Sequence, residues 1–135
     1  MHTNTITKTI YFKGVMGEIA DPLSPVLQFS LLVHPYENTI SGTVKLTISN
    51  EEKEIYSGQV TGSTHASGFK ESVRLINIRG NFPPQHKLSG IVLPFEANMS
   101  LDSNWNGSGG MTFKGRNYEK LPIKGSIFNL DSSAE

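Results

Sequence analysis

The sequence predicts an all-β domain, an antiparallel meander of about eight strands that is closed as a barrel or folded as a two-sheet sandwich. Three observations support this fold class. Hydrophobic residues alternate with polar ones at a period of two along much of the chain. No stretch of a dozen residues repeats its apolar positions at three and four, as an amphipathic helix would. Clusters of Gly, Pro, Asn and Asp separate the alternating segments, as turns would.

The clearest strand covers residues 39–49. Its apolar and glycine positions alternate with Thr, Ser and Lys, so one face is buried and the other meets solvent. The positions on the buried face are Ile40, Gly42, Val44, Leu46 and Ile48.

A second clear strand covers residues 91–102, with Leu93, Phe95 and Met99 on its apolar face. Pro94 lies on the opposite face and has no amide hydrogen to donate to a neighbouring strand. The proline therefore predicts that this strand lies at a sheet edge or is bulged there.

The remaining strands are less regular, and turns of two kinds separate them. Residues 34–38 and 115–117 are short enough for hairpins. Longer connections cover residues 16–25, 63–71 and 79–89, and binding sites concentrate on such loops. The remaining predicted strands are residues 6–15, 26–34, 54–62, 72–80, 110–115 and 118–127.

Glycines and bulky apolar residues predict the curvature of the sheet and the filling of its interior. Ser-Gly pairs recur at residues 41–42, 57–58 and 89–90, and glycine within strands favours a strongly curved sheet. The inner face is rich in bulky side chains, which leave little room for a large lumen. The predicted core residues are Leu27, Phe29, Leu31, Val33, Ile40, Val44, Leu46, Ile48, Leu93, Phe95, Met99 and Phe113.

Composition excludes several classes of function. The 135 residues include 12 basic and 12 acidic side chains and no cysteine, and the net charge is zero. Because Lys and Arg form no basic run, the sequence indicates neither a nucleic-acid partner nor a membrane partner. Without cysteine, disulfides and zinc–thiolate sites are excluded. The polar N-terminal residues predict a cytoplasmic protein. The length predicts one domain, residues 1–135, and the polar residues 131–135 predict a frayed tail.

The densest polar segment begins at Asp102. Asp102, Asn104, Asn106 and Gly107 fit the opening of an EF-hand calcium loop. The twelfth position of that loop requires a bidentate glutamate, but it holds Phe113, and no flanking helices are predicted. We therefore expect a hairpin loop and no metal site.

The same loop supports a carbohydrate-binding hypothesis. An exposed Trp105 beside Asp102, Asn104 and Asn106 would supply a stacking face and hydrogen-bonding amides for a sugar. Alternatively, Trp105, the only tryptophan, turns inward and caps one end of the core, since aromatic side chains are mostly buried.

Glu96 is the remaining candidate ligand-binding residue. It lies on the polar face of the strand at residues 91–102, where it would anchor a ligand if that face lined a barrel lumen and would meet solvent otherwise. His34, His65 and His86 have no second metal ligand at nearby helical or strand spacing, and the serines lack a G-x-S-x-G elbow. We expect neither an enzyme nor a cofactor.

Four segments carry a resemblance to a known family. They are VLQFSLLV at residues 26–33, ISGTV at 40–44, LDSNWNG at 101–107 and LPIK at 121–124. With these segments the chain resembles a family of short bacterial proteins known only as a domain of unknown function. The resemblance implies a bacterial source and an all-β domain over residues 26–124, and it implies no catalytic residues.

Three hypotheses for function remain. The first is a non-enzymatic binding or interaction protein that also associates with itself into a homo-oligomer, since zero net charge and exposed sheet edges promote assembly. The second is a carbohydrate-binding module that uses the loop at residues 102–107. The third is a barrel for a small lipophilic ligand, which the full core disfavours. The partner is accordingly a small molecule, a glycan or a protein.

Overall fold

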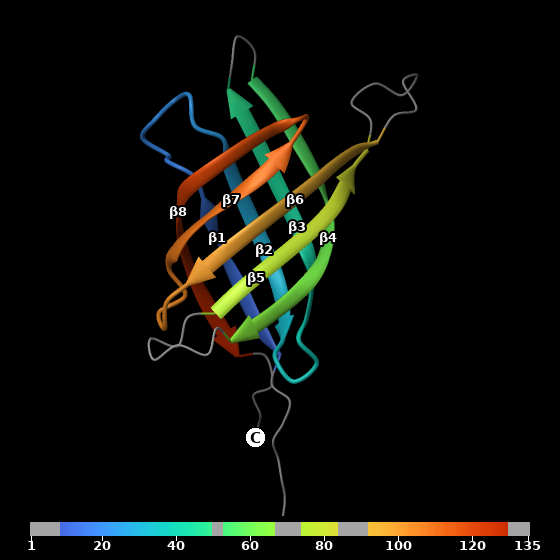
Figure 1. Cartoon of the computed structure of the whole chain (residues 1–135), viewed down its shortest axis with the longest axis vertical. Helices are drawn as coiled ribbons and strands as arrows, with labels where there is room; N and C mark the ends of the chain where they lie inside the picture. The colour runs from blue at the N-terminus through green and yellow to red at the C-terminus, as the bar shows by residue number, and fades with distance from the viewer. Residues whose placement is uncertain (1–8, 50–52, 67–73, 84–91, 130–135) are drawn as a thin grey trace, which may run out of the picture.

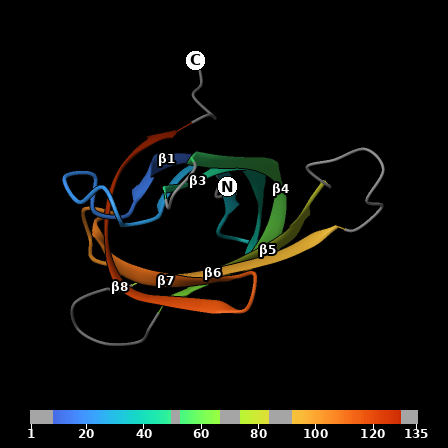
Figure 2. The ribbon, with the colours of Figure 1, turned by 90° about the horizontal axis from the view of Figure 1, so that it is seen from above.

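The chain folds as a closed, eight-stranded antiparallel barrel in the computed structural model (Figure 1). The structure describes residues 9–49, 53–66, 74–83 and 92–129. Each strand pairs with its neighbours in the chain, and β1 pairs with β8 to close the ring, which is seen from above in Figure 2. The strands are β1 (Ile10–Met16), β2 (Val26–His34), β3 (Thr39–Ser49), β4 (Lys53–Ala66), β5 (Arg74–Phe82), β6 (Leu93–Leu101), β7 (Gly107–Phe113) and β8 (Arg116–Asn129).

The all-β meander is confirmed, and the choice between barrel and sandwich is resolved in favour of the barrel. The neighbours β4, β5 and β6 also establish the strand order across residues 63–90, which the sequence left open. The predicted tail at residues 131–135 and the predicted strand start at residues 6–8 lie outside the described residues.

β4 continues four residues beyond the predicted end at residue 62. Residues 63–66 have no alternating hydrophobic pattern, so no strand is predicted there. Thr64 nevertheless faces inward and is fully buried, and its hydroxyl oxygen accepts a hydrogen bond of 3.1 Å from Arg74 at the start of β5. Thr64 thus occupies an inward position where an apolar residue would be expected, and its hydrogen bond with Arg74 satisfies the buried hydroxyl group.

The last hairpin turn differs from the prediction at residues 115–117. Lys114 and Gly115 make the turn, with φ angles of 53° and 77°, as a two-residue hairpin turn of type I′ requires. Arg116 and Asn117 already belong to β8, where they pair with Phe113 and Thr112 of β7.

The prediction of an edge strand at Pro94 is wrong, because the closed ring of described strands has no edge. No bulge occurs at Pro94 either, because it stays in register with Asn81 of β5. The pairing of β6 with β7 begins one residue later, at Phe95 and Phe113. Pro94 therefore needs no donor on that side, which explains how the ring accommodates it.

The interior of the barrel is filled by side chains. Inward positions of successive strands alternate with outward polar ones, and the predicted core residues are buried except Leu93, which packs partly buried against the others. The remaining buried hydrophobic side chains are Phe12, Met16, Tyr56, Val60, Ile76, Ile78, Phe82, Ala97, Leu101, Met111, Leu121 and Ile123.

Glycines make room for the aromatic rings where β1 and β8 close the barrel. Gly14 of β1 pairs with Gly125 of β8, and the rings of Phe12 and Phe29 pack beside them with centroids 4.8 Å apart. A Cβ atom at Gly14 would lie 2.7 Å from the Cα of Gly125 and 2.9 Å from Cζ of Phe29, and it would also meet the carbonyl oxygen of Lys124. The closure therefore depends on the absence of side chains at these two positions.

We predict that Gly14→Ala lowers the free energy of unfolding by about 1–3 kcal/mol, because the added methyl group meets backbone atoms that cannot move aside without disturbing the β1–β8 pairing. Urea unfolding measures the change. The control is Gly115→Asn, at a turn position with no atom within 4 Å, where asparagine tolerates the positive φ angle. Equal stability of the Gly14→Ala protein and the wild type would contradict the packing argument.

Candidate functional site

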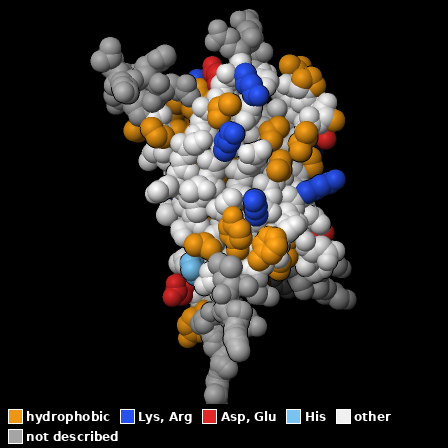
Figure 3. Space-filling view, turned by 180° about the vertical axis from the view of Figure 1, so that it is seen from behind, with side chains coloured by type: hydrophobic (Ala, Val, Ile, Leu, Met, Phe, Trp, Pro, Cys, Tyr) orange, Lys and Arg blue, Asp and Glu red, His pale blue; other side chains and the backbone are white. Residues whose placement is uncertain are grey.

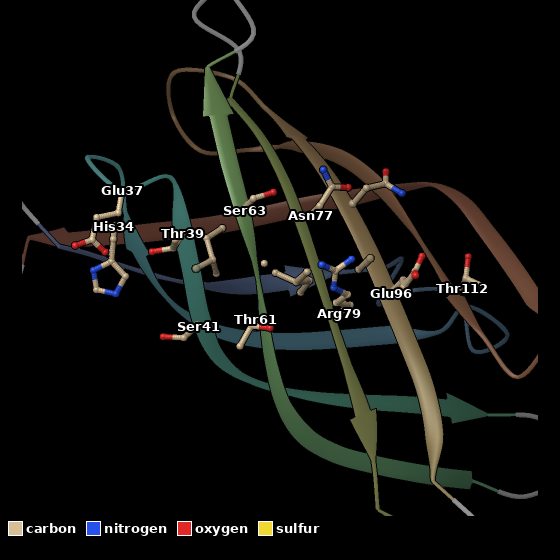
Figure 4. A pocket seen from close by; sticks show the side chains of 15 residues that line it. His34, Glu37, Thr39, Ser41, Thr61, Ser63, Asn77, Arg79, Glu96 and Thr112 are labelled. Atoms are coloured by element: carbon tan, nitrogen blue, oxygen red, sulfur yellow. The ribbon is translucent and has the colours of Figure 1, made fainter.

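A polar groove of about 760 Å³ crosses the outside of the barrel (Figure 4). Its central row consists of outward side chains that pair directly across β3, β4, β5, β6 and β7. Side chains in such rows lie close together across the strands, so they form one continuous surface. The row runs Ser41, Thr61, Arg79, Glu96 and Thr112.

A second row lies beside the first. Thr39, Ser63, Asn77 and Asn98 pair in the same way across β3 to β6. In Figure 4 the labelled side chains lie along the same stretch of the sheet, with Thr112 toward one end of the groove and the β2–β3 turn at the other. The polar groove thus offers hydroxyl and amide groups that both donate and accept hydrogen bonds.

Charges in the polar groove are few and of both signs. Arg79 and Glu96 are direct cross-strand neighbours and both are exposed. His34 and Glu37 lie at the β2–β3 end, and Nδ1 of His34 lies 3.2 Å from the Thr9 hydroxyl oxygen, within hydrogen-bonding distance. Tyr36, between them in the chain, is 80% exposed. The groove is therefore suited to a ligand that is polar but carries little net charge.

Glu96 does not enter the interior. It points outward from β6 and lines the polar groove. Sequence analysis identified Glu96 as a candidate but not its neighbours in the groove. Thr61, Arg79 and Thr112 belong to three other strands, and they lie beside Glu96 because of the strand register.

In the predicted loop site at residues 102–107, the side chains of Asp102 and Asn106 form hydrogen bonds within the protein. Oδ1 of Asp102 accepts bonds from the backbone amides of Asn104, at 2.8 Å, and Asn106, at 3.1 Å. Oδ1 of Asn106 in turn accepts a bond of 3.1 Å from the amide of Gly125 in β8. These contacts fit the expected hairpin loop, in which an aspartate side chain organises the turn. Within the described ranges, no group of three or more His, Cys, Asp or Glu could hold a metal ion.

Trp105 is half-buried and packs against the core, as the inward alternative predicted. Its ring centroid lies 5.0 Å from that of Phe12, and the guanidinium carbon of Arg74 lies 5.4 Å from the indole centroid. The backbone of Trp105 has a φ angle of 65°, which turns the side chain back over this end of the barrel. The indole is thus engaged by the protein.

A cluster that sequence reasoning missed closes the opposite end of the barrel. The Tyr56 hydroxyl donates a bond of 2.6 Å to Oε1 of Glu54, and Nζ of Lys114 donates one of 3.1 Å to the Tyr56 oxygen. Nζ of Lys114 also lies 3.6 Å from Oε1 of Glu54. Because Lys114 belongs to the β7–β8 turn and Tyr56 to β4, which are not paired strands, only the folded barrel brings these residues together.

The contacts of this cluster shift the acidity of its members. The hydrogen bond from Tyr56 is the main reason that the pKa of Glu54 falls below its usual value. Burial, followed by the bond to Glu54, raises the pKa of Tyr56, and the bond to Tyr56 raises the pKa of Lys114. The lysine and the tyrosine therefore keep their protons, so the cluster is suited to holding the barrel end together and not to supplying a nucleophile.

Comparison with known proteins assigns a family but no activity. The family model described as Domain of unknown function (DUF1842) matches residues 11–117, which include β1 except Ile10, all of β2 to β7 and the first two residues of β8. No curated protein matches the chain. In the described residues, no helix is long and apolar enough to cross a membrane.

We predict that Tyr56→Phe raises the pKa of Glu54 toward its usual value and lowers stability at neutral pH by about 1 kcal/mol, the net effect of one hydrogen bond. A lowered pKa means that ionised Glu54 stabilises the fold above its usual pKa and that this stabilisation is lost as the pH falls through the lowered value. The variant should therefore lose less stability on acidification than the wild type. NMR titration of the carboxyl carbon and urea unfolding at several pH values measure both effects.

The control for this experiment is Tyr118→Phe, because the partly buried Tyr118 has no hydroxyl hydrogen bond among the described residues. If both variants leave the titration of Glu54 unchanged, the hydrogen bond is not the cause of the shifted pKa.

Proposed function

Since the chain belongs to the family described as Domain of unknown function (DUF1842), which names no activity, we propose from the structure that it is a non-enzymatic binding protein that holds a polar ligand on the outside of its barrel. The site is the polar groove across β3 to β7.

One observation carries this proposal: the inward side chains are packed together, whereas a groove of about 760 Å³ lies on the outer face. Sites for small molecules have volumes of this order, a few hundred to about a thousand Å³. The same packing speaks against a lipophilic ligand inside the barrel, because Phe12, Phe29, Phe82, Phe95 and Phe113 already occupy the interior.

The lining of the groove favours a carbohydrate. A sugar presents many hydroxyl groups and no charge, and it is matched by side chains that both donate and accept hydrogen bonds. Such groups come from four strands, as Ser41, Thr61, Asn77 and Asn98. The exposed Tyr36 is not itself part of the lining, but it lies in the turn between the lining residues His34 and Glu37 and offers an aromatic face there. The loop at residues 102–107 is the weaker carbohydrate candidate, since its Asp102 and Trp105 are engaged within the protein.

Self-association is a second candidate function, supported by an exposed apolar row. Phe128 of β8, Tyr11 of β1 and Leu32 of β2 pair side by side on the outer face, and the rings of Tyr11 and Phe128 lie 6.0 Å apart. Phe128 is 52% exposed. The edge-pairing argument for assembly is wrong, since the described strands form a closed ring, so association would depend on this apolar row instead.

We predict that maltohexaose, cellohexaose or chitohexaose shifts backbone amide NMR signals of β3 to β7 around the polar groove. The double variant Asn77→Ala/Arg79→Ala should weaken that binding about tenfold or more, because it removes central hydrogen-bonding groups from the lining. Trp105→Phe is the matched comparison and should leave the affinity unchanged. Shifts confined to residues 102–107 and lost with Trp105→Phe would favour the loop, and no shift with any of the three sugars would contradict a carbohydrate ligand.

For self-association, light scattering across a wide range of protein concentration should show a mass that rises with concentration and a rise that Phe128→Ser removes. Ile19→Ser serves as the control, because Ile19 is 72% exposed in the loop before β2 and lies outside the apolar row. A constant monomer mass for the wild type would exclude this candidate.

A further inference from the structure

A second groove, of about 670 Å³, lies on the outer face of β1 to β4, and we name it the cationic groove. Figure 3 shows the face of the barrel formed by these strands, with Lys and Arg side chains across its middle and Asp and Glu side chains toward its margins. The cationic groove is distinct from the polar groove, whose lining comes from β3 to β7, the β2–β3 turn and His34 at the end of β2.

The register brings two lysines from separate strands to this groove. Lys13 of β1 pairs with Ser30 of β2, which pairs with Thr43 of β3. In the next row, Gln28 of β2 pairs with Lys45 of β3. The two lysines therefore lie on either side of β2, at a lateral separation of two strand spacings, about 10 Å. Long flexible stems allow both ammonium groups to reach a ligand lying between them.

No acidic side chain balances these lysines within the groove. Strands β1, β2 and β3 contain neither Asp nor Glu, and the lining residues include none. Lys13 and Lys45 form no ion pair with any carboxylate among the described residues. A third lysine, Lys124 of β8, pairs with Val15 at the border of the groove and adds to the positive potential.

The remainder of the lining is apolar and hydrogen-bonding in character. Val15 and the methylene stems of the lysines supply apolar surface. Ser30 and Thr43 supply hydroxyl groups, and Gln28 and Gln59 supply amides. This combination suits a molecule with a negatively charged group, bound by ammonium and hydroxyl donors, and a small apolar body.

We infer that the cationic groove binds a small organic anion whose charged group, a carboxylate, phosphate or sulfonate, lies between Lys13 and Lys45. The inference does not depend on the proposed function, because the two grooves lie on different parts of the barrel surface. The charged residues of the cationic groove are Lys13 and Lys45, whereas Arg79 and Glu96 lie at the centre of the polar groove. A long polyanion such as nucleic acid does not fit, since two or three lysines would neutralise few of its phosphates.

The test uses 1-anilinonaphthalene-8-sulfonate, a fluorescent organic anion, and its uncharged relative N-phenyl-1-naphthylamine. We expect saturable one-to-one binding of the sulfonate to the intact chain that weakens as the ionic strength rises. The double variant Lys13→Gln/Lys45→Gln should weaken sulfonate binding about tenfold or more, since it removes both charged donors. Amide NMR shifts on adding the sulfonate should include Gly14, Gln28 and Gly58, which lie along the groove.

The matched control is Lys120→Gln, because Lys120 is an exposed lysine of β8 that lies where the pairing with β7 shifts register, outside the cationic groove. It should leave sulfonate binding unchanged, and urea unfolding should show that all variants retain the fold. Sulfonate affinity that is equal in the double variant and the wild type overturns the inference. So does equal or stronger binding of the uncharged relative, or an equal loss of affinity in Lys120→Gln.

Discussion

The closed ring of eight strands constrains everything else in this molecule, because it encloses a narrow interior, and in this barrel side chains fill that interior. Three of the large inward rings are accommodated beside glycines. Phe12 and Phe29 pack beside Gly14 and Gly125, and Phe82 packs beside Gly58. With the interior filled in this way, space for ligands exists on the outer face, where the two grooves lie.

Most of the fold could be predicted from the sequence because barrel strands repeat with period two, and an alternating pattern is visible without knowledge of the partners. The core positions from Leu27 to Ile48 follow directly from that alternation. The errors occurred where local pattern and long-range context disagree. Thr64 is polar, which predicts exposure, but it is buried and accepts a hydrogen bond from Arg74. Pro94 predicts an edge strand, but it lies in a closed barrel, one residue before the pairing of β6 with β7 begins.

The candidate sites were less predictable, for a physical reason. Sequence reasoning finds residues that are close along the chain, such as Asp102, Asn104 and Asn106, and in the structure these bond mainly to their own loop and to β8. The grooves consist of a few residues from each of several strands, and the register brings these residues together. Lys13 and Lys45 are 32 positions apart in the sequence, where they resemble scattered surface charges. In the structure both line the cationic groove, whose lining contains no Asp or Glu. Neutral net charge therefore does not describe the local potential of a folded surface.

Pairing between β1 and β8 also determines how the chain reaches its native state. Seven of the eight strand pairings join consecutive strands, so those contacts form between segments that are close together in the chain. The eighth joins residues 10–16 to residues 123–129, so nearly the whole chain must be looped back before it can form. The loop-closure entropy of that step is larger than that of any of the seven pairings between consecutive strands. The ring is therefore complete only when the two strands that lie farthest apart in the chain have met.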